Sequence, residues 1–166
     1  MTFDESRHQK LIELLARTDF VPSYLALCAK YSVRVGIDGP HIDMAALNAI
    51  FRKIGVETTW HKRFRTFEFD HETIAGWEWK GSLVIQKYDR LEPMMEGQKG
   101  RYGVGSTLLS LAINSGMLRD PPIEINAPAP RPSFDGDMRT MERMVPDLIA
   151  LFRSVKDAIR QHWSDA

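Results

Sequence analysis

The strongest pattern in this sequence is a row of apolar residues near its end, repeated at helical spacing. The members of the row stand 4, 3, 4, 3 and 4 positions apart: Met141, Val145, Leu148, Phe152, Val155 and Ile159. Side chains at these intervals share one face of a helix. We therefore predict a long helix that lies on a sheet, begins near Asp137 and has a kink or a second start at Pro146. A homodimer through residues 141–159 is the alternative, because the same spacing suits a coiled coil.

Shorter helices are predicted in the first third of the chain. Thr2 and Glu5 have the spacing of a capping box, which favours a helix from there to about Arg17. Pro22 suits the first turn of a second helix, since a proline there costs no helical hydrogen bond. A third helix is expected to end at Gly55, because the apolar residues before it fall on one face: Leu47, Ile50, Phe51 and Ile54.

The middle of the chain alternates apolar and polar residues with the period of a β-strand. The alternation indicates an antiparallel meander over about residues 56–89, with a hairpin turn at Lys80–Gly81. A short strand at 33–37 and a turn at 38–40 are expected before it. The predicted fold class is α+β: an antiparallel meander sheet covered by N-terminal helices and a long C-terminal helix. A length of 166 residues predicts a single domain over 1–166.

Glycine and proline dominate two stretches of the second half. Four glycines and a proline lie between Glu92 and Gly105, which predicts a loop. Within it, Gly100–Thr107 matches the spacing of a phosphate-binding loop, except that Ser106 replaces the lysine that contacts phosphate. Five prolines between residues 121 and 132 predict an extended segment without helix.

Titratable residues gather at Asp70, His71 and Glu72, and they are the basis of an enzyme hypothesis. A histidine suits proton transfer, because its unperturbed pKa lies at about 6.5. Together with Gly100–Thr107, His71 would serve a small enzyme acting on a phosphorylated or nucleic-acid substrate. The other histidines are scattered over the chain. No catalytic residue, metal site or cofactor is therefore predicted.

The balance of charge weighs against a nucleic-acid binder. The chain has 22 basic and 22 acidic residues, whereas nucleic-acid-binding domains are usually strongly basic. One basic cluster, residues 61–65, has the aromatic residues Trp60 and Phe64 beside its charges, as nucleic-acid contacts do. Nearby acidic residues are expected to neutralise it across paired strands: Glu57, Glu68, Asp70 and Glu72. Nucleic acid is therefore a disfavoured partner.

A lone cysteine and the absence of targeting patterns suggest the compartment. Cys28 is the only cysteine, so an intramolecular disulfide is impossible, and its apolar neighbours predict a buried thiol. The first residues do not resemble a signal peptide. The longest apolar run, Leu148–Phe152, is much shorter than the roughly 20 residues of a membrane span. These features predict a cytoplasmic protein that does not enter a membrane.

Aromatic and methionine residues suggest where a partner protein would bind. Trp60, Trp77 and Trp79 belong either to the core or to a partner-binding surface. Tryptophan, tyrosine and arginine dominate interface hot spots, and methionine adapts to irregular surfaces. The predicted partner contacts are therefore Trp79, Arg90, Met94, Met95, Arg101 and Tyr102.

The function that these observations favour is a non-enzymatic protein-binding module. By analogy with small α+β inhibitors, the predicted class is a bacterial immunity or antitoxin protein whose partner is a toxin or effector enzyme. The enzyme that would use Gly100–Thr107 and His71 is the first alternative. A self-associating assembly subunit that pairs through the C-terminal helix is the second.

Overall fold

The computed structural model describes residues 1–32, 41–86 and 91–164. The helices are α1 (Glu5–Ala16), α2 (Phe20–Lys30), α3 (Met44–Lys53), α4 (Leu108–Met117) and α5 (Met138–His162). The strands are β1 (Thr2–Phe3), β2 (Thr58–His61), β3 (Thr66–Ile74), β4 (Trp77–Ile85), β5 (Leu91–Lys99) and β6 (Tyr102–Thr107). They form one six-stranded sheet in the order β1-β6-β5-β4-β3-β2, in which β1 is parallel to β6 and the other pairs are antiparallel. The predicted α+β class is confirmed.

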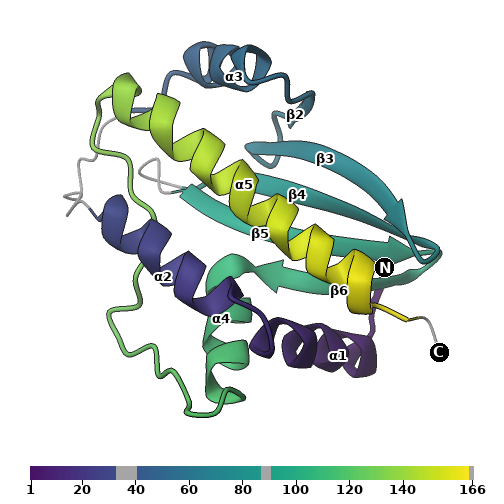
Figure 1. Ribbon diagram of the computed structural model, residues 1–166. Helices are drawn as coiled ribbons and strands as arrows, with labels where there is room; N and C mark the ends of the chain where they lie inside the picture. The colour runs from purple at the N-terminus through teal and green to yellow at the C-terminus, as the bar shows by residue number, and fades with distance from the viewer. Residues whose placement is uncertain (33–40, 87–90, 165–166) are drawn as a thin grey trace.

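Helix α5 runs diagonally across one face of the sheet (Figure 1). The residues of the apolar row are buried, each with at most 2% of its surface exposed. The ring of Phe152 meets the ring of Phe69 on β3 edge-on, with the centroids 5.0 Å apart. The helix prediction is thus confirmed, and Pro146 lies inside the helix. Because the row already packs within the chain, a homodimer through 141–159 would have to pull these side chains away from the sheet.

The predicted N-terminal helices are present, with one change at the start of the first. Asp4 rather than Thr2 caps α1, since its carboxylate accepts a hydrogen bond from the backbone N–H of Arg7 at 3.0 Å. Thr2 belongs instead to β1, which pairs with β6. Gly55 follows α3 with a φ of 72°, as expected at a helix end. The strand and turn predicted over 33–40 lie outside the described residues.

The sheet extends well beyond the predicted meander, because the stretch predicted as a glycine-rich loop forms β5 and β6. Its glycines are sites of close packing. A Cβ atom on Gly97 would lie 2.8 Å from the ring of Trp79, and one on Gly105 would overlap the backbone of β5. Glycine is therefore needed where a ring or a neighbouring strand covers the backbone. The loop prediction was wrong for this reason.

The hairpin predicted at Lys80–Gly81 is also wrong, because both residues lie inside β4. A Cβ atom on Gly81 would overlap the ring of Phe69, so this glycine too permits close packing within the sheet. The turn between β3 and β4 is Ala75–Gly76, with φ values of 50° and 76°. Two positive φ values in succession are typical of a two-residue hairpin turn.

The tryptophans divide between core and surface. Trp77 and Trp79 are 1% and 0% exposed, and they belong to the core beneath α5. Trp163, which follows α5, meets both rings edge-on, with centroid distances of 5.9 and 5.2 Å. Trp60 on β2 differs, since it is 36% exposed, although its ring centroid lies 4.5 Å from that of Phe67. The sequence did not decide whether Trp60, Trp77 and Trp79 belong to the core or to the surface. Of these three, Trp60 is the one at the surface.

The proline-rich segment 118–137 contains no helix, as its prolines predict, and forms no strand either. It runs from α4 to α5 past α2 (Figure 1). The hydroxyl of Tyr24 on α2 donates to the carbonyl of Pro130 at 3.1 Å, and the backbone N–H of Ser133 donates to the carbonyl of Tyr31 at 2.9 Å. Side-chain and backbone hydrogen bonds thus attach the segment to α2.

Gly97→Ala is expected to lower the free energy of unfolding by about 1–3 kcal/mol, because the added methyl group overlaps the buried ring of Trp79. Urea unfolding measures the change. Gln98→Ala, at the exposed neighbouring position, is the control and should change stability by less than about 0.5 kcal/mol. In a Trp79→Leu background the Gly97→Ala penalty should shrink, since the ring is gone. A Gly97→Ala variant as stable as the wild type would contradict this packing.

Candidate functional site

Two of the predicted partner contacts lie in the core. Trp79 and Met95 are both 0% exposed, so in the folded chain neither offers surface to a partner. Their strand positions explain this, because both side chains point to the sheet face that α5 covers: Met95 pairs with Gly81, two residues along β4 from Trp79. Arg90 lies outside the described residues.

The other predicted contacts lie within β5 and beyond its end. Met94 is half-buried in the first half of the strand. Arg101 and Tyr102 follow its end, where the Arg101 guanidinium lies 5.1 Å from the Tyr102 ring centroid and donates to the Tyr102 hydroxyl at 3.0 Å. About 17 Å of strand separates Met94 from Lys99. The fold therefore does not gather the predicted contacts into one surface.

The residues of the enzyme hypothesis are also far apart. His71 lies on β3 and Gly103 on β6, with β4 and β5 between them. At the usual spacing of strands this is about 14 Å, which is too far for both to contact one reacting group. Most of Gly100–Thr107 is strand β6 rather than a loop. Within the described ranges, no group of three or more His, Cys, Asp and Glu side chains could hold a metal ion.

A hollow of about 290 Å³ lies on the sheet face opposite α5. Its residues alternate along the strands with buried residues of the core face, such as Phe67 and Leu83. We call it the sheet hollow. Its lining comes from β2 to β5 and the β2–β3 turn, and its polar members are His61, Thr66, Glu68, Lys80, Ser82 and Glu96. Phe64, Val84 and the predicted contact Met94 complete it.

The charged side chains of the sheet hollow pair with one another. The Lys80 ammonium contacts Glu68 on β3 and lies 3.7 Å from Glu96 on β5. Ser82 donates to Glu96 at 3.1 Å, and Nε2 of His61 lies 3.1 Å from Glu68. Partial burial raises the pKa of Glu68, but Lys80 and His61 outweigh this effect and hold the pKa below its usual range. The two carboxylates of the hollow, Glu68 and Glu96, thus share one ammonium.

The turn between β2 and β3 forms a rim of the sheet hollow and carries a prominent aromatic ring. Phe64 is 67% exposed, the largest fraction of any aromatic side chain in the described residues. The Arg63 guanidinium lies 5.5 Å from its ring centroid, and Arg65 follows with a φ of 48°. We call residues Lys62–Arg65 the basic turn. The sequence showed the basic cluster, but no partner contact was predicted in it, although an apolar residue between two arginines was a usable signal.

Two acidic residues expected to neutralise the basic turn point elsewhere. Asp70 and Glu72 contact α5, at a bulge where Asp70 has a φ of 60° and the β3–β4 register shifts. Lys62 and Arg63 have no acidic partner among the residues that the structure describes. The expected neutralisation across paired strands is therefore wrong for these two residues. The basic turn keeps a net positive charge.

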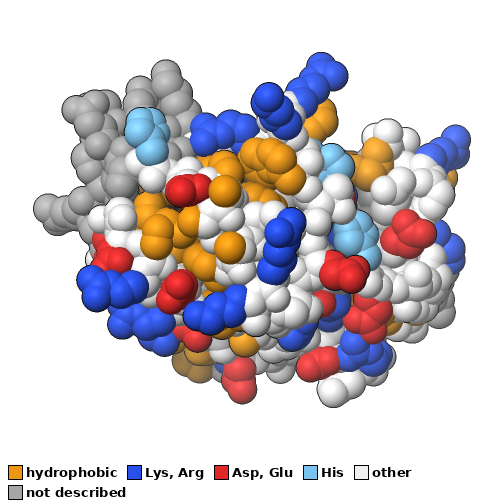
Figure 2. Space-filling model, turned by 90° about the horizontal axis from the view of Figure 1, so that it is seen from above, with side chains coloured by type: hydrophobic (Ala, Val, Ile, Leu, Met, Phe, Trp, Pro, Cys, Tyr) orange, Lys and Arg blue, Asp and Glu red, His pale blue; other side chains and the backbone are white. Residues whose placement is uncertain are grey.

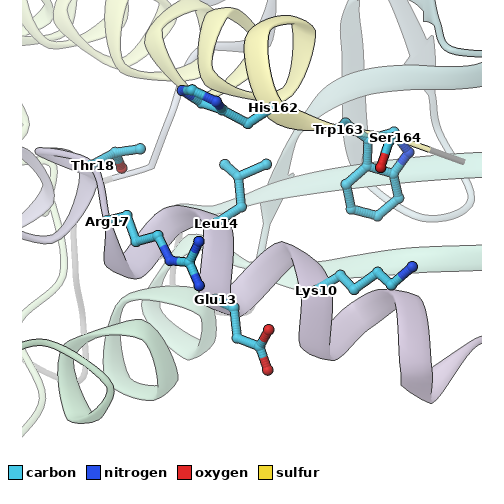
Figure 3. A pocket seen from close by; sticks show the side chains of 8 residues that line it. All are labelled: Lys10, Glu13, Leu14, Arg17, Thr18, His162, Trp163 and Ser164. Atoms are coloured by element: carbon cyan, nitrogen blue, oxygen red, sulfur yellow. The ribbon is translucent and has the colours of Figure 1, made fainter. Parts of the chain in front are cut away.

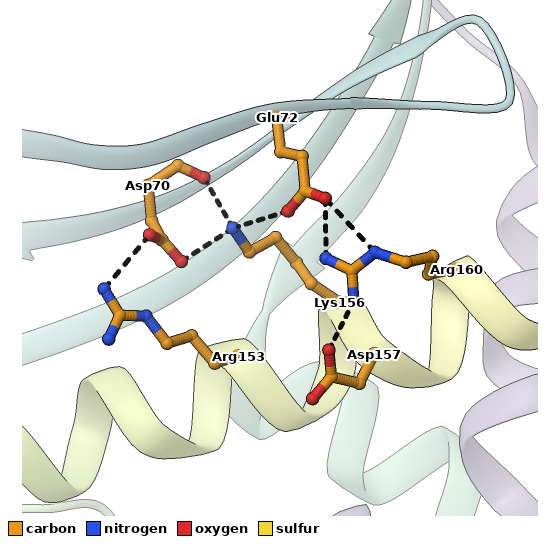
Figure 4. Close-up of polar contacts among 6 residues, drawn as sticks. All are labelled: Asp70, Glu72, Arg153, Lys156, Asp157 and Arg160. Atoms are coloured by element: carbon orange, nitrogen blue, oxygen red, sulfur yellow. Dashed lines mark hydrogen bonds and ion pairs between the residues drawn. The ribbon is translucent and has the colours of Figure 1, made fainter.

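Lys156 of α5 is the centre of the network that holds Asp70 and Glu72 (Figure 4). Its side chain is 6% exposed, and its ammonium lies 2.7 Å from Asp70 and 3.1 Å from Glu72. It also donates to the backbone carbonyl of Asp70 at 2.9 Å. Arg153 lies 3.4 Å from Asp70, and Arg160 lies 2.6 Å from Glu72. The nearly buried lysine thus has the opposite charges and the acceptors that burial of an ammonium requires.

The same network lowers the pKa of both carboxyl groups. Burial raises the pKa of Asp70, but hydrogen bonds and charges from Lys156 and Arg153 outweigh this effect. For Glu72 the hydrogen bond from Arg160 is the largest influence, and it lowers the pKa. A lowered pKa in the folded state means that the ionised carboxylates stabilise the fold.

A hollow between α3 and the start of α5 has an apolar lining and a charged rim. Hydrophobic side chains gather on this face of the molecule (Figure 2). The lining combines two adjoining depressions of about 510 and 200 Å³, and its apolar members are Ala46, Ala49, Ile50, Ile54 and Met138. Lys53, Arg139, Glu142 and Arg143 supply charges of both signs at the rim. No single charge type therefore marks this hollow for a particular ligand.

Another hollow of about 510 Å³ lies between α1 and the end of α5 (Figure 3). Leu14 points from α1 into the space, and Arg17 and His162 flank it. Both helices end at this place, and helix C-termini favour cations. The helix ends therefore explain why Arg17 and His162 lie here. The carboxylate of Glu13 also lines the hollow, so its charges are of both signs.

Comparison with protein-family models, with curated proteins and with solved structures found no significant match for this chain. None of the helices in the described residues has the length and apolar composition that a membrane span requires.

Lys156→Met is expected to lower the free energy of unfolding at pH 7 by about 3 kcal/mol, because it leaves two carboxylates without their shared partner. The folded-state pKa values of Asp70 and Glu72 are lowered, so their contribution is complete above about pH 5 and is lost as the pH falls below about 4. Urea unfolding would be measured at pH 7 and below about pH 4. The difference in the free energy of unfolding between Lys156→Met and the wild type should be smaller at the lower pH.

Arg139→Met is the matched control for this prediction. Arg139 is also on α5 and pairs with Asp137, but its side chain is 87% exposed. Its loss should change stability by at most about 0.5 kcal/mol, as is usual for an exposed ion pair. Equal effects of Lys156→Met and Arg139→Met would show that the Lys156 network does not stabilise the fold.

Proposed function

We propose that this chain is a non-enzymatic protein-binding module that inhibits a partner protein in the manner of bacterial immunity and antitoxin proteins. The basic turn, Lys62–Arg65, and the adjoining sheet hollow form the contact surface. The observation that carries the proposal is Phe64, a 67% exposed ring between two arginines on a turn where Lys62 and Arg63 have no acidic partner among the described residues.

Phe64 and Arg63 have the composition of an interface hot spot. Aromatic residues and arginine supply most of the binding energy in protein interfaces. Burial of a phenylalanine ring contributes about 1.5–3 kcal/mol. While Phe64 is exposed, most of that energy is absent from the fold. Its position is therefore better explained by binding than by the stability of the free chain.

The charges around the contact surface indicate an acidic partner. Lys62 and Arg63 are positive and unpaired in the described chain, so an acidic patch would complement them. In the sheet hollow, Glu68 and Glu96 share the single ammonium of Lys80, so a partner that covers them would also supply a hydrogen-bond donor or a positive charge at this point. With 22 basic and 22 acidic residues in total, the chain suits short-range recognition of one protein rather than capture of a polyanion.

The inhibitory role rests on analogy with small α+β inhibitors. A toxin or effector enzyme is the class of partner that this analogy supplies, and the cytoplasm is the compartment we propose for the complex. The lone cysteine fits a reducing compartment: Cys28 is buried, and desolvation raises the pKa of its thiol to about 11.

Phe64→Ala and Arg63→Ala are expected to weaken partner binding at least about tenfold, as hot-spot truncations do. Tagged protein would first be used to capture the partner from native lysate. The purified pair would then be titrated by calorimetry. Tyr102→Ala, at the far end of the sheet, is the matched control for an exposed aromatic residue and should bind like the wild type. All three side chains are exposed, so urea unfolding should show little change in stability.

Two results would overturn the proposal. If no protein is retained in stoichiometric amount, the chain is not a protein-binding module of this kind. If Tyr102→Ala and Arg101→Ala abolish binding while Phe64→Ala does not, the contact surface lies at the β5–β6 turn instead.

A further inference from the structure

Strand β2 is the last strand of the sheet, so one of its two edges has no neighbouring strand in the described chain. The strand is short, Thr58–His61, and its residue Trp60 is 36% exposed. An unpaired edge presents backbone N–H and C=O groups to any strand that can reach it. The residues in and around β2 therefore decide which strand can add to it.

The hydrogen-bond pattern of the sheet identifies the free backbone groups. The backbone N–H of Ile85 donates to the carbonyl of Arg65 at 2.8 Å, so the backbone groups of Arg65, Phe67 and Phe69, which precede the bulge, face β4. The residues between them face β2 and pair there with its odd-numbered residues. Thr58 and Trp60 therefore point their backbone N–H and C=O groups to the free edge. No hydrogen bond from these groups to another described residue is present.

The charges around β2 are self-complementary in the antiparallel direction. Glu57 precedes the strand, whereas Lys62 and Arg63 follow it. If two copies of β2 pair about a two-fold axis, the start of one strand lies beside the end of the other. Glu57 of each copy then lies near the basic residues of the second copy. A parallel pairing would instead place like charges together, which is unfavourable.

We propose that the free edge of β2 binds the β2 edge of a second copy of this chain, to give an antiparallel, two-fold dimer. The free groups of Thr58 and Trp60 fit three registers, with Thr58, Thr59 or Trp60 on the axis. With Thr58 on the axis, Glu57 of one copy would be offset by about three residues from Lys62 of the other, so the charges favour the registers with Thr59 or Trp60 on the axis. In both registers the Trp60 rings are brought together near the axis. The two sheets continue as one, and both sheet hollows face the same side.

Sedimentation velocity with charge-reversal variants tests the dimer. The wild type is expected to be dimeric at about 100 µM, and Glu57→Lys should raise the dissociation constant at least about tenfold, because it places like charges across the interface. The double variant Lys62→Glu/Arg63→Glu should have the same effect. Combining all three substitutions exchanges the signs and should restore the dissociation constant to within about threefold of the wild type.

The combined variant keeps the test independent of folding. If the single reversals abolish the dimer and the combined variant restores it, the loss came from charge complementarity rather than from unfolding. A wild type that remains monomeric at about 1 mM would overturn the proposal. So would a dimer that none of the reversals weakens, because it would use another surface.

Disulfide trapping gives a second readout and distinguishes the registers. Thr59→Cys should cross-link if Thr59 lies on the axis, because facing residues of a non-hydrogen-bonded pair are about 4.5 Å apart at Cα, within disulfide range. The double variant Thr59→Cys/His61→Cys should cross-link if Trp60 lies on the axis. Gln98→Cys, exposed on β5, is the control and should stay reduced. Cys28 is 1% exposed and does not compete. Absence of both cross-links would contradict edge pairing.

This dimer does not depend on the proposed protein-binding function, but both surfaces use Lys62 and Arg63, so Phe64 is the residue that distinguishes them. Phe64→Ala leaves the edge of β2 intact and should leave the dissociation constant of the dimer unchanged. Loss of partner binding in Phe64→Ala with an unchanged dimer would separate the two surfaces. A monomeric wild type that still binds its partner through Phe64 would overturn the dimer alone.

Discussion

The packing of α5 across one face of the sheet is the interaction on which the rest of the structure depends. The apolar row from Met141 to Ile159 fills the core, and each fully buried side chain of this size contributes roughly 1.5–3 kcal/mol. The sheet face beneath the helix must carry large rings that lie close to neighbouring strands. Gly81 and Gly97 make this possible, because a side chain at either position would overlap an aromatic ring. The polar residues of the strands are left to the opposite face, where the sheet hollow lies.

The polar side of the same helix determines where the acidic residues of β3 point. Burying Lys156 is costly, and its ion pairs at best roughly balance the cost of removing its charge from water. Its larger effect is on geometry, because it holds the bulge of β3 against one turn of α5 and draws Asp70 and Glu72 to the helix side. Neither carboxylate is then available to the basic turn, Lys62–Arg65, which stays positive.

The features that could be predicted from the sequence depend on neighbours a few residues away. The apolar row gave α5, Asp137 caps that helix, and Gly55 ends α3. The glycines of β5 and β6 were misinterpreted because their partners, such as the ring of Trp79 above Gly97, are distant in the sequence. In the candidate site, too, the local pattern was predictable and the long-range contacts were not. The basic cluster around Phe64 was visible, but the acids expected to neutralise it turn away at a bulge that no local pattern indicates.

The zero net charge therefore conceals a definite arrangement of charge. Acidic and basic residues balance in the Lys156 network, and two carboxylates share one ammonium in the sheet hollow, while charges of opposite sign remain at the two ends of β2. Charge on an edge strand normally prevents unwanted pairing. Here Glu57 at one end and Lys62–Arg63 at the other oppose parallel addition and favour antiparallel addition of the same strand. The order of charges along this edge thus selects the direction and identity of the strand it accepts, which the total charge of the chain cannot do.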